Sequence, residues 1–234
     1  MVKGIQFEGL RVVGKPDELA TKYANEGADE LLYIDTVASL YGRNQLCGLL
    51  ERTTEHVFIP VTVGGGIKSR ADVKRLLDSG ADKVAINTEG LKRPALIKEL
   101  ADYYGSQAVV VSIEAKRIGD GRWECYTDCG REKTGKDVQE WAEEAVALGA
   151  GEILITSIDQ DGTRKGFDLS LITALRGLPV PVTASGGMGC IAHLRQAIHA
   201  GADAVAMGSV IHYGKTTFGE MRAGLVTKLS VTHS

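Results

Sequence analysis

Residues 27–35 read GADELLYID, and three later stretches follow the same pattern: GADKVAINT at 80–88, GAGEILITS at 149–157 and GADAVAMGS at 201–209. Each stretch starts with Gly-Ala and continues into a short apolar run. The glycine is typical of a helix C-terminus, and an uninterrupted apolar run is typical of a parallel strand covered on both faces. Helical periodicity precedes every copy, at residues 16–27, 70–80, 138–149 and 191–201. The chain is therefore predicted to alternate helices with buried parallel strands.

The repeats are spaced as two halves of a duplicated unit. Gly27 and Gly149 are 122 residues apart, and glycine-ended strands at 57–66 and 179–189 recur with nearly the same offset. We therefore predict an α/β fold of the (βα)8 TIM-barrel class, built by an internal half-barrel duplication. A single domain is expected over residues 1–234, with half-barrels at approximately 1–104 and 105–225 and a tail at 226–234.

Symmetry requires eight strands, but the sequence offers seven. They are predicted near residues 30–35, 58–63, 83–87, 107–113, 152–158, 181–185 and 203–208. The partner of the strand in SQAVVVSIEAK (106–116) would fall before Met1, so residues 1–10 are predicted to be the tail of strand 1 and its following loop. The strand itself is expected to be missing from this chain, and residues 227–234 are a weaker candidate to replace it.

Composition and charge limit the function classes. The 234 residues are 44% hydrophobic and 24% charged, which is typical of an ordinary globular domain. A net charge of -3 gives no basic surface for nucleic acid, and no apolar run is long enough to span a membrane. Cys125 and Cys129 lie without a second cysteine pair or a nearby histidine, so we expect reduced thiols, no metal site and no cofactor. Because no signal-peptide pattern opens the chain, we expect a cytoplasmic protein.

Small residues that follow the strands predict anion binding at two places. In this class of barrel, phosphate is often held after strands 7 and 8, where glycines let backbone N–H groups approach an anion. The corresponding residues are Gly186-Gly187 and Gly208-Ser209, with Asp161-Gly162-Thr163 beside them after strand 6. The duplication supplies a second copy in Gly64–Gly66 and Asn87-Thr88. Such glycines also suit tight turns alone, but two symmetric copies favour a ligand with two phosphate groups.

Carboxylates are expected where the strands end. Glu114 ends strand 5 and is a candidate general acid or base, unless it forms a salt bridge with Lys116 or Arg117. Asp35 and Asp159 end strands 2 and 6, and Asp35 is as well suited to orienting a neighbour as to reacting.

Charged residues are also expected at the opposite face. Glu30, Lys83 and Glu152 each follow a repeat glycine by three residues, and symmetry brings them together around the barrel axis. Buried charges are costly unless they are paired, so a satisfied ionic layer is the simpler interpretation. The alternative is a polar gate for a small molecule that crosses the barrel.

With these residues described, the chain resembles the cyclase subunit of imidazole glycerol phosphate synthase, from histidine biosynthesis. The resemblance extends from Val2 to about Tyr213 and is carried by VKGIQFEGLR, GADELLYIDTVAS, PVTVGGGIKS, GADKVAINT, GSQAVVVSIEAKR, GAGEILITSIDQDGT, ASGGMG and residues 209–212. It implies an ammonia-dependent lyase in a heterodimer with a glutaminase subunit, whose ammonia crosses the barrel. At the mouth, ammonia would convert a bisphosphorylated ribulosyl aminoimidazole-carboxamide into imidazole glycerol phosphate and aminoimidazole-carboxamide ribotide.

The resemblance also implies roles for individual residues. One phosphate site would comprise Gly66, Asn87 and Thr88, and the other Asp161, Gly162, Gly187, Gly208 and Ser209. Lys3 matches the lysine of the family's mobile first loop, Asp82 and Gln107 match the glutaminase-docking face, and Glu30, Lys83 and Glu152 match the ammonia gate. The resemblance therefore moves the interpretation of these last three residues toward a gate.

Two departures from the family pattern bear on catalysis. The family's two catalytic aspartates end strands 1 and 5, and the strand 1 aspartate and the gate arginine have no match here. Glu114 replaces the strand 5 aspartate, which moves the carboxylate outward by one methylene. Displacements near an ångström can cost about a hundredfold in rate. Cys129 also stands where family members often have a small hydroxyl residue.

Three functions are therefore compatible with the sequence. The first is the cyclase subunit with Glu114 as one half of an acid–base pair. The second is a paralogue that uses channelled ammonia to amidate a cell-surface sugar precursor, which an altered strand 5 acid would accompany. The third is a truncated barrel that binds ligand or glutaminase without catalysis. The related single-chain isomerase of the same pathway is disfavoured, because it needs no ammonia gate.

Overall fold

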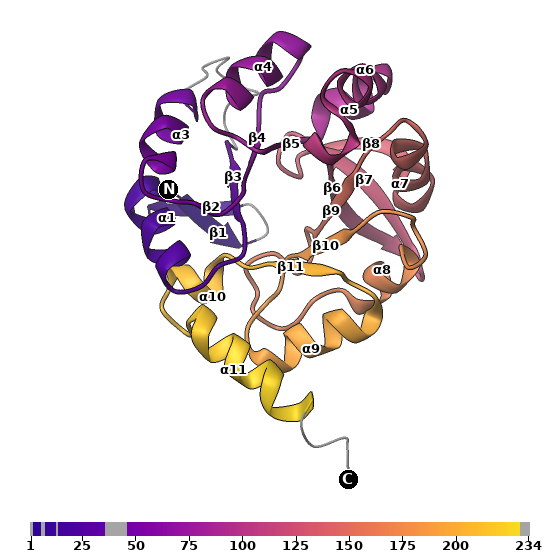
Figure 1. Cartoon of the computed structure of the whole chain (residues 1–234). Helices are drawn as coiled ribbons and strands as arrows, with labels where there is room; N and C mark the ends of the chain where they lie inside the picture. Colours follow the sequence, from indigo (N-terminus) through magenta and orange to yellow (C-terminus); the bar gives the residue numbers. More distant parts are fainter. Residues whose placement is uncertain (1, 6–7, 13, 36–45, 230–234) are drawn as a thin grey trace.

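The computed structural model describes residues 2–5, 8–12, 14–35 and 46–229, and its centre is a curved parallel sheet inside a ring of helices (Figure 1). Seven parallel strands follow one another in the order β11-β10-β9-β6-β5-β4-β3. They are β3 (Leu31–Ile34), β4 (Val61–Gly64), β5 (Lys83–Ile86), β6 (Val109–Gly119), β9 (Glu152–Ser157), β10 (Val182–Ser185) and β11 (Ala204–Ala206). Each overlaps one of the seven predicted strands, so the predicted α/β barrel is confirmed.

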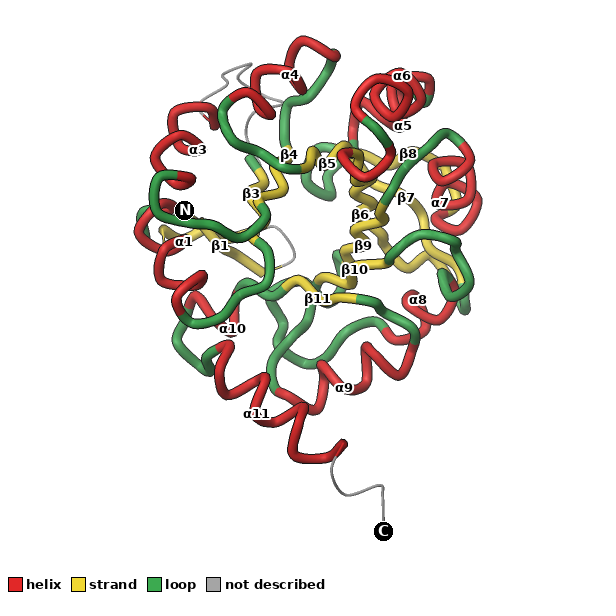
Figure 2. The backbone as a smooth tube through the Cα atoms, in the orientation of Figure 1, coloured by secondary structure: helices red, strands yellow, loops and turns green. Residues whose placement is uncertain are grey.

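Helices surround the outer face of the sheet, as the tube drawing makes plain (Figure 2). The four predicted helices are α1 (Pro16–Asn25), α4 (Arg70–Asp78), α7 (Val138–Ala147) and α9 (Ile191–Ala200). The others are α3 (Leu46–Thr54), α5 (Thr88–Lys92), α6 (Ala95–Tyr104), α8 (Leu169–Ala174), α10 (Ser209–His212) and α11 (Phe218–Leu229), with a 3-10 turn at Ser106–Ala108. Within the described residues, no helix is long and apolar enough to cross a membrane.

Local sequence explains where several helices begin and end. The Ser69 hydroxyl accepts the N–H of Asp72 at the start of α4, and the Asp137 carboxylate accepts the N–H of Gln139 at the start of α7. Both are standard N-caps that satisfy an otherwise unpaired backbone donor. Gly201 ends α9 with φ +116, a left-handed conformation that glycine adopts without a steric penalty.

The apolar core lies between the sheet and the helices. Leu50, Leu76, Leu100 and Trp141, from four different helices, are at most 1% exposed. Full burial of such side chains contributes roughly 1.5–3 kcal/mol each. A smaller cluster of Ala85, Val110 and Leu154, packed with Ala206, comes from the alternate strand positions and therefore faces the barrel interior.

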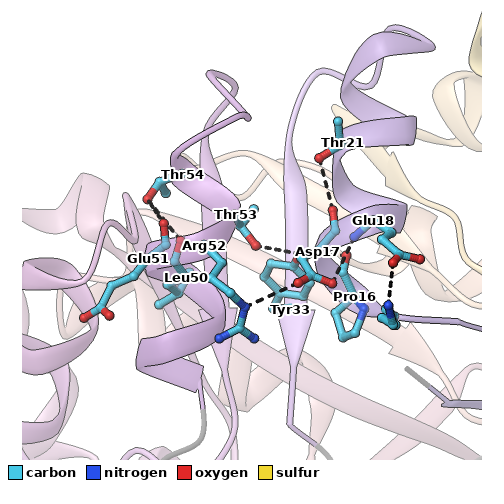
Figure 3. A network of polar contacts seen from close by, with 11 residues as sticks. Pro16, Asp17, Glu18, Thr21, Tyr33, Leu50, Glu51, Arg52, Thr53 and Thr54 are labelled. Atoms are coloured by element: carbon cyan, nitrogen blue, oxygen red, sulfur yellow. Dashed lines mark hydrogen bonds and ion pairs between the residues drawn. The ribbon is translucent and has the colours of Figure 1, made fainter.

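A polar network ties α1 and α3 to β3, the strand at one end of the sheet order (Figure 3). The Tyr33 hydroxyl donates to Pro16 O at 3.1 Å and lies 3.2 Å from Thr53 Oγ1. Arg52 Nε donates to Asp17 Oδ2 at 3.3 Å, which joins the two helices directly. These contacts hold β3 from its outer side, whereas Leu32 and Ile34 on its inner side are exposed.

The N-terminal region differs from its prediction. Residues 1–10 were expected to be a strand tail and a loop, whereas β1 (Val2–Ile5) and β2 (Glu8–Val12) pair with each other as a separate antiparallel sheet. Among the described residues, no strand lies between β11 and β3 at the two ends of the parallel order. Leu32 and Ile34 of β3 are accordingly 38% and 42% exposed.

The C-terminal candidate for an eighth strand is wrong for the part that the structure describes. Residues 227–229 belong to α11, which runs to Leu229 against α9. The remainder of that candidate, 230–234, lies outside the described residues.

The structure contains an antiparallel extension that the repeat pattern does not predict. β6 continues beyond the barrel to Gly119, turns at residues 120–121, and pairs with β7 (Arg122–Thr127), which pairs in turn with β8 (Glu132–Asp137). The Gly-Asp-Gly sequence at 119–121 is a turn signal that would have indicated this hairpin. The extension matters because it begins at Glu114.

Candidate functional site

The carboxyl ends of the parallel strands carry the residues of both predicted phosphate sites. Gly65-Gly66 and Asn87-Thr88 follow the adjacent strands β4 and β5, and Gly186-Gly187 and Gly208-Ser209 follow the adjacent strands β10 and β11. Asp161-Gly162 follows β9, which pairs with β10. The structure therefore brings each predicted set together, while phosphate binding itself stays a prediction.

The two sites share a backbone conformation. Asn87 precedes α5 with φ -119 and ψ -87, and Gly208 precedes α10 with φ -121 and ψ -76. The Asn87 side chain accepts no hydrogen bond from α5, and Gly208 has no side chain with which to cap α10. The first N–H groups of both helices are thus available to an anion, for which the helix dipole is favourable.

Glycine is required in both strand-end turns by the backbone itself. Gly65 has φ +104, and a Cβ there would lie 2.3 Å from Asp35 O. Gly187 has φ +102, and a Cβ there would lie 1.9 Å from Gly166 O. Tight turns alone therefore explain these two glycines, and it is the paired helix starts that favour phosphate binding.

Glu30, Lys83 and Glu152 meet at the opposite end of the barrel, as predicted; we call them the ionic cluster. Lys83 Nζ donates to Glu30 Oε2 and to Glu152 Oε2, both at 2.9 Å. The free carboxylate oxygens accept the hydroxyls of Thr62 and Thr183, the latter at 2.7 Å. Every charge in the cluster is therefore paired and hydrogen-bonded, which is the condition for tolerating partial burial.

Electrostatics favour the charged form of Lys83. Burial acts to lower the pKa of the Lys83 ammonium, but its hydrogen bonds to Glu30 and Glu152 outweigh burial and raise the pKa. Asp82, next to Lys83, accepts the N–H of Val61 at 2.8 Å. This bond and its symmetric copy, in which Asp203 accepts the N–H of Val182 at 2.8 Å, tie the starts of neighbouring strands together.

Gln107 precedes β6 at this face, and Gln107 Nε2 donates to Tyr104 O at 3.2 Å. Asp82 precedes β5, the neighbour of β6, so both predicted partner-contacting residues lie on the face of the ionic cluster. Whether they touch a partner subunit stays a prediction.

Glu114 lies on β6 where that strand leaves the barrel. Its Oε2 accepts the N–H of Gly130, in the turn between β7 and β8, at 2.7 Å. The salt bridge considered for Glu114 is absent among the described residues, because Arg117 pairs with Asp168 and Lys116 lies over the ring of Tyr126. Glu114 is thus a half-buried carboxyl held by a backbone amide.

The pKa of Glu114 suits proton transfer near neutrality. Burial raises the pKa of its carboxyl to about 7, even though the Gly130 N–H and the Asn87 side chain stabilise the ionised form. A general acid or base works best when its pKa lies near the operating pH. Glu114 is therefore equipped to take up or release a proton.

One group of residues around the site was not found from the sequence. Asp168 accepts Arg117 Nη2 at 2.8 Å, Trp123 Nε1 at 2.9 Å and the N–H of Leu171 at 3.2 Å. It thereby joins the extension that begins at Glu114 to the start of α8. The N-cap role of an aspartate before LSLITA was readable in the sequence, but its contacts with Arg117 and Trp123 were not.

The remaining predicted residues are placed as follows. Asp159 Oδ2 accepts the N–H of Arg117 at 2.9 Å, and Asp161 is 5% exposed beside it. Asp35 follows β3 and donates its N–H to Gly64 O at 2.9 Å. Lys3 falls in β1, and its side chain lies outside what the structure describes.

Cys125 and Cys129 lie in surroundings that suppress the reactivity of their thiols. Burial raises the pKa of the Cys125 thiol to about 12 and that of the Cys129 thiol to about 11, so both stay protonated at neutral pH. None of the four cysteines, all of which the structure describes, forms a disulfide bond. In the part of the chain that the structure describes, no group of His, Cys, Asp and Glu side chains could hold a metal ion.

Comparison with known proteins agrees with this geometry. The family model described as "Histidine biosynthesis protein" matches residues 1–217. The chain is 60% identical over 190 residues to "Imidazole glycerol phosphate synthase subunit HisF" of Legionella pneumophila, with 81% of this chain and 90% of the relative covered. It is 48% identical over 235 aligned positions to the protein of the same description from Mycobacteroides abscessus, with 97% and 91% covered.

Proposed function

Because the chain belongs to the histidine biosynthesis protein family, and its relatives above are HisF subunits, we propose that it is the cyclase subunit of imidazole glycerol phosphate synthase. The substrate is a bisphosphorylated ribulosyl aminoimidazole-carboxamide, which ammonia converts into imidazole glycerol phosphate and aminoimidazole-carboxamide ribotide. The observation that carries the proposal is the pair of matched helix starts, at Asn87 and Gly208, on the strand-end face that also holds Glu114.

Two phosphate sites define which ligand fits. The first phosphate site comprises Gly66, Asn87 and Thr88, and the second comprises Asp161, Gly162, Gly187, Gly208 and Ser209. Each lies after a pair of neighbouring strands, and the two pairs, β4–β5 and β10–β11, are separated in the sheet order by β6 and β9. A ligand with a phosphate at each end would span the mouth, whereas a monophosphate would leave one site empty. Lys3 is proposed as a further ligand-binding residue, as the family resemblance implies.

Glu114 supplies the proton transfers. Addition of ammonia to the ketone of the ribulosyl group requires one proton to leave the nitrogen and another to reach the oxygen. A carboxyl whose pKa is about 7 is populated in both protonation states at neutral pH, so it can serve in either direction. The family's second catalytic acid ends strand 1, and a parallel strand between β11 and β3 would bring its carboxyl end to the same face as Glu114.

Ammonia would reach this face through the barrel. The ionic cluster lies at the other end, with Lys83 bridging two carboxylates that come from β9 and from the residue before β3. Displacement of one Lys83 hydrogen bond would open the axis to a small neutral molecule. We propose that a glutaminase subunit docks on this face around Asp82 and Gln107 and releases ammonia there.

Turnover tests the proposal directly. Two forms of the protein would be given ammonium chloride at pH 8.5 and the bisphosphorylated substrate. One form is the chain itself, and the other is expressed from a coding sequence extended upstream in the genome. Glu114→Gln, which keeps a hydrogen-bond acceptor for Gly130 but cannot exchange protons, should lower the rate by about 100-fold or more. A rate unchanged by Glu114→Gln would remove Glu114 from the mechanism.

The two alternative functions predict other results. A paralogue that amidates a surface sugar would fail to complement a histidine auxotroph despite expression of folded protein. A non-catalytic barrel would bind the bisphosphorylated substrate but show no ammonia-dependent turnover in either form. Both relatives reported above are named for the synthase, and neither alternative draws support from them.

A further inference from the structure

The turn that joins β7 to β8, residues 127–131, touches both the acid and the first phosphate site. The Gly130 N–H donates to Glu114 Oε2 at 2.7 Å. The Asp128 N–H donates to Thr88 Oγ1 at 3.3 Å. One short turn therefore contacts a proposed catalytic carboxylate through one amide and a proposed phosphate-binding residue through another.

The end of β7 adds a third contact between the same regions. Asn87 Nδ2 donates to Tyr126 O at 3.3 Å, immediately before the turn. The Asn87 side chain also acts on Glu114, where it favours the ionised carboxylate. The acid, the turn and the residue that precedes α5 thus form one hydrogen-bonded unit.

The backbone of the turn is unusual for its residue types. Asp128, Cys129 and Gly130 have φ angles of 52, 58 and 74, so three consecutive residues are left-handed and two of them carry side chains. Left-handed conformation is disfavoured for residues other than glycine and persists where surrounding contacts require it. Backbone N–H groups in such turns can bind anions. Here one of them, the Gly130 N–H, binds the Glu114 carboxylate.

Charged and titratable groups around Glu114 come chiefly from this turn. The Asp128 carboxylate raises the pKa of Glu114, and the Arg131 guanidinium lowers it, after the larger effects of burial and of hydrogen bonding. The Cys129 thiol also faces Glu114, whose charge contributes to the raised pKa of that thiol. From β5, the facing group is the neutral amide of Asn87.

We propose that the β7–β8 turn is a positioning element for Glu114, with the Gly130 N–H as the group that fixes its carboxylate. The proposal deepens the function given above, since it explains how a glutamate serves where the family has the shorter aspartate. The extra methylene brings the carboxylate to the turn, and the amide then holds it in one place. The hydrogen bond from the Asp128 N–H to Thr88 Oγ1 positions the turn, and with it the Glu114 carboxylate, relative to the first phosphate site.

A titration of the unmodified protein tests the contact without any turnover. In the protein labelled with ¹⁵N, the Gly130 amide proton should shift downfield as Glu114 ionises, with a midpoint near pH 7. In protein labelled with ¹³C at glutamate carboxyls, the Glu114 signal is identified by its loss in Glu114→Gln and should show the same midpoint. A Gly130 amide that does not follow the Glu114 titration would overturn the proposal.

A pair of matched variants separates the contact from backbone strain. Gly130 and Gly135 lie on one hairpin, have φ angles of 74 and 73, and donate to glutamates at 2.7 and 2.8 Å, but Gly135 holds Glu124 instead. Gly130→Ala should displace its amide and raise the Glu114 midpoint by about one pH unit. Gly135→Ala carries the same left-handed strain and should leave that midpoint unchanged. Equal shifts in both variants, or none in Gly130→Ala, would refute the role of the Gly130 amide.

A third variant keeps the test available if Gly130→Ala does not fold. Asp128→Asn removes the facing charge but retains a residue that tolerates the left-handed region. It should lower the Glu114 midpoint and move the acid limb of the pH–rate profile of kcat/KM the same way, while KM for the substrate changes little. A Glu114 midpoint that does not move would contradict the proposal. Loss of turnover with the titrations intact would instead count against the proposed function alone.

Discussion

Replacement of Glu114 by glutamine should stabilise the protein at high pH, which is unusual for a change at a site residue. The carboxyl has an ordinary pKa of 4.5 and a folded-state pKa of about 7. Since folding raises this pKa, ionisation of Glu114 costs nothing below about pH 4.5 and increasingly destabilises the folded state between about pH 4.5 and 7. Glutamine keeps the shape of the side chain and an oxygen for the Gly130 N–H, but it carries no charge.

The size of the effect follows from the shift. A difference of about 2.5 pKa units corresponds to about 3 kcal/mol in the free energy of unfolding, as an upper bound for a half-buried side chain. Glu114→Gln should therefore match the original protein near pH 4.5 and exceed its stability by about 1–3 kcal/mol above pH 7. The gain should grow steadily between those pH values.

Urea unfolding at several pH values between 4.5 and 8.5, followed by tryptophan fluorescence and circular dichroism, measures the difference. Glu124→Gln is the matched control, because Glu124 accepts the Gly135 N–H in the same hairpin. If the stability difference between Glu114→Gln and the original protein were the same at every pH, the raised pKa and the site electrostatics built on it would be refuted.

Three further substitutions test other parts of the structure. Lys83→Met leaves Glu30 and Glu152 facing each other and should destabilise the protein by roughly 1–3 kcal/mol, discounted for partial exposure, whereas Lys74→Met, which breaks an exposed pair with Asp78, should leave the midpoint of urea unfolding nearly unchanged. Gly187→Ala places a methyl group 1.9 Å from Gly166 O at φ +102 and should lower the free energy of unfolding by about 2–4 kcal/mol. Gly177→Ala, at φ +103 with nothing within 4 Å, should lower it by about 1–2 kcal/mol. Equal losses of stability in the two variants would contradict a steric clash at Gly187. In Asp168→Asn the amide cannot accept hydrogen bonds from both Arg117 and Trp123 as the carboxylate does. The free energy of unfolding should fall by about 1–3 kcal/mol, and the fluorescence of Trp123 should change. An unchanged unfolding midpoint would show that Asp168 does not hold the β6–β8 extension.

The parts of the fold that repeat along the chain could be predicted from the sequence. Four copies of a Gly-Ala strand pattern, each preceded by helical periodicity, predicted four of the parallel strands and four helices. Three other apolar runs predicted the remaining strands, because all these signals are local. The same symmetry placed Glu30, Lys83 and Glu152 together, and the structure confirms their hydrogen bonds. It also placed Asn87 and Gly208 at equivalent helix starts.

What the sequence did not predict depends on contacts between distant segments. The β6–β8 extension interrupts the repeat, so symmetry gave no template for it. Gly130 reaches Glu114 only after the chain has turned between β6 and β7 and again after β7. Asp168 joins Arg117 and Trp123 across about 50 residues of chain for the same reason. The offset between the two halves predicts a strand tail and loop over residues 1–10, and that offset carries no information on the pairing of β1 with β2.

The central claim is that one bisphosphorylated ligand occupies both phosphate sites at once, and calorimetric titration with the bisphosphorylated substrate measures this directly. We expect one ligand per chain, bound about 100-fold or more tightly than a matched monophosphate, since two linked contacts reinforce each other. Thr88→Asp and Ser209→Asp, one in each site, should each reduce this affinity to that of the monophosphate. Equal affinities for the two ligands, or two independent ligands per chain, would contradict the account.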